Sequence, residues 1–202
     1  MPLTAAQLAT LKADIVANTN VIPTGYPWSG SFVGQQVKNI PNDSGDGNAA
    51  VAGWYNLLAS PDYYGYRRNI SSTDVFNKID FAKLTPADAP DGTQTWANRS
   101  LCCQGKQFNL QLILDRAVID ATQAQTRATL QDALTNIPSG ASGATISAWV
   151  PVRDILQEKI TNAEKLFSSG GTGGFPPAGT PTTRTVYGTI SVQDVNSALN
   201  LP

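Results

Sequence analysis

The chain of 202 residues contains no histidine, the side chain that most often serves as a general base or a metal ligand. Its absence removes Ser–His and Cys–His nucleophile pairs and most zinc and iron sites. A phosphate-binding Gly-x-x-x-x-Gly-Lys-Ser/Thr motif is also missing, because the glycine-rich stretch 170–174 follows a predicted helix and no lysine comes after it. We therefore expect no enzymatic activity, no cofactor and no bound metal.

Charged residues are scarce, at 14% of the chain against about 25% in a typical soluble protein. The net charge is −1, and Arg67-Arg68 is the only pair of adjacent basic residues. This excludes the basic footprint of a nucleic-acid-binding domain. The low charge fits a surface that is covered by other proteins, and it fits a plain polar surface equally well.

The two cysteines, Cys102 and Cys103, are adjacent, a spacing at which a disulfide is rarely formed. We interpret them as small apolar residues and expect no disulfide framework. No apolar run approaches the roughly 18 residues of a membrane span. The amphipathic start of the chain, which carries Lys12 and Asp14, is not typical of a signal peptide.

One stretch of the chain resembles the start of a calcium-binding loop. Asn42, Ser44 and Asp46 alternate as the first ligands of such a loop would. The first ligand would normally be aspartate, however, and the position of the bidentate glutamate is occupied by Gly53. A polar turn is therefore the default interpretation.

Helical periodicity dominates the rest of the chain. Thr4 and Gln7 form a capping box in sequence, and Leu8, Leu11 and Ile15 share one face of the helix that follows. The longest helix is predicted from about 147 to 168, beginning at Trp149 or Val150 because Pro151 is tolerated in a first turn. Further helices are predicted from about 48 to 60, from 71, from 94, from 120 to 136, and from 191.

Residues from about 20 to 47 contain eight glycine and proline residues, a density that forbids a long helix. We expect an extended arm or a β-hairpin, with Tyr26, Trp28 and Phe32 as apolar anchors. The arm either folds back on its own core or docks on a neighbouring subunit, and the sequence leaves both alternatives open.

Towards the C-terminus, residues 169–183 consist almost entirely of Gly, Pro, Thr and Ser, the composition of a linker. Residues 184–190 alternate and are rich in β-branched side chains, which predicts a strand that presents Val186, Tyr187 and Ile190. The predicted fold is thus mainly α: a helical bundle over 1–168 with the arm inserted at about 20–47, and a tail over 169–202 with linker, strand and short helix.

The densest aromatic and basic cluster comprises Tyr63, Tyr64, Tyr66, Arg67 and Arg68. Tyrosine and arginine are enriched where protein interfaces gain most of their binding energy. The same side chains can also stack on a base or a sugar. We interpret the cluster as part of an interface or of the core, and keep ligand binding as the alternative.

Several segments resemble a family of small structural proteins encoded by tailed phages and prophages. The resemblance covers the opening stretch 3–15, the Asn-Asp-Ser-Gly-Asp-Gly block at 42–47, and the Ala-Ser-Pro-Asp-Tyr-Tyr-Gly-Tyr-Arg segment at 59–67. It continues in the Ala-Glu-Lys-Leu-Phe segment at 163–167, which a Gly/Thr tract follows, and in the ending at 188–195. The chain departs from the family in an insertion between about 20 and 38 and in the stretch 93–119.

This resemblance implies a virion component, such as a head-to-tail adaptor or another neck or tail ring subunit, assembled in the host cytoplasm. Its partners would be further copies of itself and the portal and tail proteins, with DNA as a passing, non-specific cargo and no membrane. A capsid decoration protein is one alternative. A non-virion binding module that uses the residues from Tyr63 to Arg68 is the other.

Overall fold

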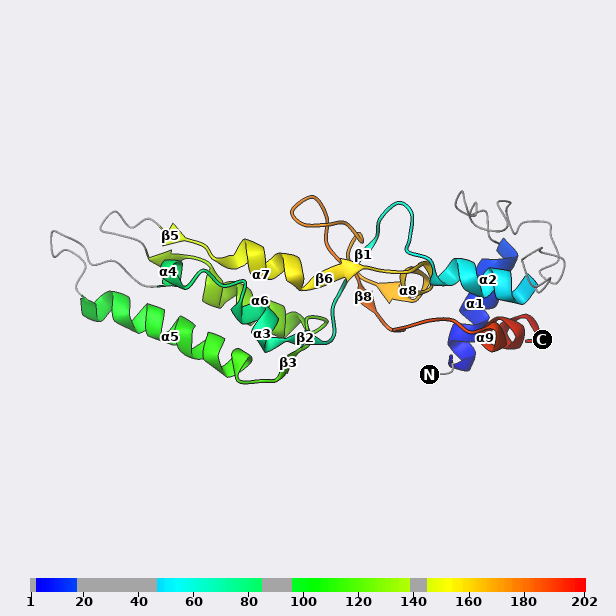
Figure 1. Ribbon diagram of the computed structural model, residues 1–202, viewed down its shortest axis with the longest axis horizontal. Coiled ribbons are helices and arrows are strands. Elements are labelled where there is room, and N and C mark those ends of the chain that lie inside the picture. The colour runs from blue at the N-terminus through cyan, green and yellow to red at the C-terminus, as the bar shows by residue number, and fades with distance from the viewer. Residues whose placement is uncertain (1–2, 18–46, 85–95, 139–144) are drawn as a thin grey trace. The chain divides into compact units, whose positions relative to one another are not determined.

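The computed structural model describes residues 3–17, 47–84, 96–138 and 145–202 (Figure 1). The chain divides into two compact units. Unit 1 comprises 1–65 and 159–202, and unit 2 comprises 66–158. The predicted arm at about 20–47, with Tyr26, Trp28 and Phe32, lies outside the described residues apart from Gly47, which begins a helix. The predicted boundary at 168/169 falls inside unit 1.

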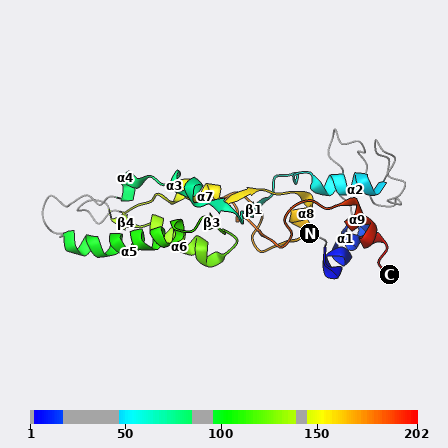
Figure 2. The same ribbon diagram turned by 60° about the horizontal axis from the view of Figure 1, so that its bottom comes forward.

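Unit 1 is built from both ends of the chain, and its α1 and α9 lie side by side in Figures 1 and 2. Its helices are α1 (Ala5–Ala17), α2 (Gly47–Asn56), α8 (Asn162–Leu166) and α9 (Val192–Leu199). Its short strands are β7 (Ser168–Ser169) and β8 (Thr183–Arg184), which pair antiparallel. Their common core consists of Leu11, Ile15, Val51, Ala52, Trp54, Tyr55, Ala163, Phe167, Ile190, Val195 and Ala198.

Hydrogen bonds between distant segments hold unit 1 together. The side-chain amide of Asn56 donates to the Ile190 carbonyl at 2.8 Å and accepts from the Ile190 N–H at 2.7 Å. The Lys12 ammonium donates to the Leu201 carbonyl at 2.6 Å. The Tyr55 hydroxyl donates to the Asp14 carboxylate. The C-terminal segment is therefore an integral part of this unit.

Unit 2 carries α3 (Ser72–Phe76), α4 (Phe81–Leu84), α5 (Trp96–Leu114), α6 (Ala124–Leu134) and α7 (Trp149–Ile155). Strand β2 (Ile70–Ser71) pairs antiparallel with β3 (Val118–Ile119), and β4 (Ile137–Pro138) with β5 (Thr145–Ile146). The core of unit 2 contains Ile70, Val75, Leu110, Ile113, Ile119, Leu130, Leu134, Ile137, Val152 and Leu156.

The prediction of a mainly α helical bundle is wrong. The structure is about 50% helical and 14% strand, with the strands in small two-stranded sheets, and it is a mixed α/β fold. The remaining sheet pairs β1 (Tyr64–Tyr66) with β6 (Gln157–Lys159). Of the predicted strand at 184–190, only Arg184 is in β-structure. The bundle prediction failed because the apolar periodicity was extended across short breaks between elements.

The predicted long helix at 147–168 shows how this happened. Helix α7 begins at Trp149 as predicted but ends at Ile155, and Gln157–Lys159 forms β6. Thr161 then caps α8 in a complete capping box with Glu164. The Thr-x-x-Glu signature of that box is present in the sequence and marks a new helix start. Because apolar residues recur at helical spacing on both sides of Thr161, the pattern predicted one continuous helix instead.

Other helix predictions are confirmed. Thr4 and Gln7 exchange the predicted capping hydrogen bonds at the start of α1, at 2.8 and 3.3 Å. Ser191 and Asp194 form a capping box at the start of α9. The second helix, predicted from about 48 to 60, ends earlier, at Asn56, and Leu58 beyond its end is 56% exposed.

Candidate interaction surfaces

Tyr63 and Tyr64 contact the loop between β7 and β8, which we call the 170–182 loop. The Tyr64 N–H donates to the Gly173 carbonyl at 2.7 Å, and the Thr182 N–H donates to the Tyr64 carbonyl at 2.9 Å. The Tyr63 ring fills the space in which a Cβ of residue 173 would lie, and the Lys165 ammonium is 5.0 Å from the centre of that ring. Both tyrosines thus have partners within unit 1.

The 170–182 loop is closed by its own hydrogen bonds. The Thr172 hydroxyl accepts from the Thr180 N–H at 3.0 Å, and the Thr180 carbonyl accepts from the N–H groups of Thr172 and Gly173 at 2.9 Å. Phe175 packs edge-on against Tyr64, with ring centres 5.1 Å apart, and remains 41% exposed. The composition predicted a linker here, and the structure shows a folded loop that presents one exposed phenylalanine.

Tyr66 and Arg67 belong to unit 2 and have other partners. The Arg127 guanidinium lies 3.9 Å from the centre of the Tyr66 ring. The Arg67 guanidinium donates to the Ile155 carbonyl at 3.2 Å and lies 3.7 Å from the Glu158 carboxylate. The predicted cluster is therefore divided between the two units, and Tyr63, Tyr64, Tyr66 and Arg67 each have contacts of their own.

The three candidates from the predicted C-terminal strand lie in unit 1. Ile190 is buried in the core and Val186 packs half-buried against it. Tyr187 lies over the Arg184 guanidinium, 4.5 Å from ring centre to carbon. The sequence predicted that a strand presents Val186, Tyr187 and Ile190, whereas the structure places these side chains against their own unit.

Arg184 forms a buried ion pair in unit 1. Its guanidinium donates to the Glu164 carboxylate at 3.0 Å, and the two side chains are only 4% and 10% exposed. The second oxygen of Glu164 accepts the Thr161 N–H of the capping box at 3.1 Å. The backbone of Gly65 passes so close that a Cβ there would lie 3.2 Å from the Arg184 side chain. This arrangement fixes α8 against β8.

Two side chains of unit 1, Asp194 and Lys159, have shifted pKa values. Burial opposes ionisation of Asp194, but hydrogen bonds from the hydroxyl and N–H of Ser191 and from the N–H of Leu3 outweigh it and lower its pKa. The hydrogen bond and negative charge of Asp62, 2.7 Å from the Lys159 ammonium, raise the pKa of that lysine. The first shift stabilises the ionised Asp194 carboxylate, and the second stabilises the protonated Lys159 ammonium.

Exposed aromatic side chains were not singled out from the sequence. Five of the six phenylalanines lie in the described residues, and Phe76, Phe81, Phe108 and Phe175 are 41–60% exposed. The rings of Phe76 and Phe81 contact each other, with centres 4.7 Å apart. On α5, Phe108 is accompanied by Leu112, which is 51% exposed. The signal was available for α5, since Phe108 and Leu112 are out of phase with the buried Leu110 and Ile113.

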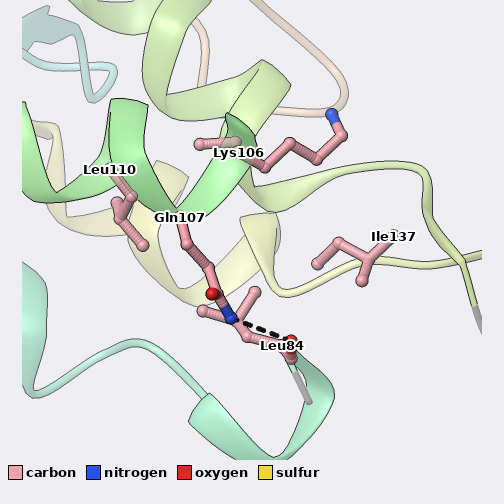
Figure 3. Close-up of a pocket in the computed structure, with 6 residues that line it drawn as sticks. Leu84, Lys106, Gln107, Leu110 and Ile137 are labelled. Atoms are coloured by element: carbon pink, nitrogen blue, oxygen red, sulfur yellow. Dashed lines mark hydrogen bonds between the residues drawn. The ribbon is translucent and has the colours of Figure 1, made fainter. Parts of the chain in front are cut away.

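Two hollows of unit 2 lie beside α5. The first, among Leu84, Lys106, Leu110 and Ile137, has a volume of about 10 Å³, enough for one water molecule at most (Figure 3). The Gln107 amide donates to the Leu84 carbonyl there at 3.4 Å. The second is a space of about 550 Å³ that is wide open to solvent and lies over the surface of α5, next to Gln104, Gly105, Gln107, Phe108 and Gln111.

In the part of the chain that the structure describes, no three Asp, Glu, Cys or His side chains gather as a metal site would require. Within the same residues, no helix has both the length and the apolar character to cross a bilayer. No protein-family model matches the chain, and neither the curated proteins nor the solved structures contain a match to it.

Proposed function

We propose that the chain is a structural subunit of a protein assembly, and specifically of a tailed-phage virion. The observation that supports an assembly role is the exposure of Phe76, Phe81, Phe108 and Phe175. Phenylalanine is among the residues most often buried in a monomer, and aromatic side chains are enriched at protein interfaces. Four exposed rings on a weakly charged chain fit a protein whose surface is covered in its working state.

The assignment to a virion is supported by the resemblance of five sequence segments to a family of phage structural proteins. A neck or tail ring subunit in contact with the portal is the position we propose. The fold is mixed α/β, so the predicted helical bundle is no argument for that position. The proposal rests on the sequence segments and on the exposed aromatic surfaces.

A capsid decoration protein is the alternative within the virion. Ligand binding by Tyr63, Tyr64, Tyr66 and Arg67 is less well supported, because each of these residues has a partner of its own within a unit.

The test is the copy number of this chain in purified particles of a phage or induced prophage that encodes it. Quantitative mass spectrometry would compare the chain with the major capsid protein. About a dozen copies would support a neck or tail ring, and hundreds would indicate a decoration protein. Absence of the chain from intact particles would contradict the virion proposal.

A further inference from the structure

We draw no further inference here: the strongest candidate, the apolar tip of the 170–182 loop around the exposed Phe175 in unit 1, carries none, because nothing in the structure shows what covers it.

Discussion

At the scale of single residues, the Tyr63 ring can pack where it does only because residue 173 is a glycine without a Cβ. Gly173 has a φ of +69°, and the Tyr63 ring lies where its Cβ would be. Gly170 has almost the same φ, +67°, but a Cβ there would meet nothing within 4 Å. The two glycines therefore separate the cost of backbone strain from the cost of a steric clash.

Gly170→Ala should lower the free energy of unfolding by about 1–2 kcal/mol, the cost of a left-handed backbone for a residue with a Cβ. Gly173→Ala should cost that amount and a further 1–3 kcal/mol for displacing the ring. Chemical denaturation measures both. Adding Tyr63→Ala should bring the effect of Gly173→Ala down to that of Gly170→Ala. Equal losses for the two single variants would show that the ring contact contributes nothing.

The buried ion pair of Arg184 and Glu164 contrasts with the exposed pair of Lys159 and Asp62, whose side chains are 46% and 52% exposed. Arg184→Met keeps the aliphatic volume but leaves the buried Glu164 carboxylate without its cation, so we expect a loss of about 3–5 kcal/mol of stability. Lys159→Met removes an ion pair that solvent screens, so the free energy of unfolding should change far less than in Arg184→Met. Denaturant titration at pH 7 compares them, and similar losses would contradict the assigned difference in burial.

At the scale of elements, capping decides where the helices of unit 1 begin. Thr161 accepts the Glu164 N–H at 3.2 Å, and Ser191 accepts the Asp194 N–H at 3.1 Å. Each cap satisfies a donor that a helix start leaves without an intrahelical partner. The short α8 has only 5 residues and depends on this cap more than a long helix would.

Thr161→Ala should therefore destabilise unit 1 by about 0.5–2 kcal/mol. Thr10→Ala is the matched control, because Thr10 is an exposed residue within α1 whose hydroxyl donates to the Ala6 carbonyl one turn back. Alanine has the higher helix propensity, so that variant should be neutral or slightly stabilising. Unfolding monitored by circular dichroism would detect the difference, and a neutral Thr161→Ala would show that the cap is dispensable.

The lowered pKa of Asp194 predicts a pH dependence for α9. An unfolded aspartate has a pKa of about 3.9, so the ionised cap stabilises the folded chain fully above that value. The contribution is lost as the pH falls through the lower folded pKa. Stability of the unaltered protein minus that of Asp194→Asn, measured from pH 7 to pH 2 at constant ionic strength, should therefore decline below pH 4. A difference that stays constant would contradict the lowered pKa.

At the scale of the whole molecule, the chain has two hydrophobic cores. Leu11 is fully buried in the core of unit 1, and Leu130 is fully buried in that of unit 2. Each core is large enough for the stability of its unit to respond to a single cavity.

Leu130→Ala should destabilise unit 2 by about 2–5 kcal/mol and Leu11→Ala should destabilise unit 1 by a similar amount. Native-state hydrogen exchange with mass spectrometry assigns the change to segments. Leu130→Ala should accelerate exchange within 66–158 and leave α1, α2 and α9 protected, and Leu11→Ala should give the reverse. Uniform acceleration along the chain in both variants would mean that the units unfold together.

The sequence by itself determined the elements whose signals are local. The caps of α1 and α9 and the start of α7 follow from side chains within a few residues of the helix end, and such interactions do not need a distant partner. The buried positions Leu11 and Ile15 could likewise be predicted from their helical spacing.

Only the tertiary structure decided which distant segments meet. Gln157–Lys159 lies within the helix predicted from about 147 to 168, yet it pairs with residues 64–66, and strand pairing depends on a partner far away in sequence. The composition of the 170–182 loop predicts a linker, because the contacts that order it come from Tyr63 and Tyr64, more than 100 residues earlier in the sequence. The spacing places Phe108 and Leu112 opposite Leu110 and Ile113 on α5, but the tertiary structure decides which of the two sides faces the core, since burial is a property of the whole fold.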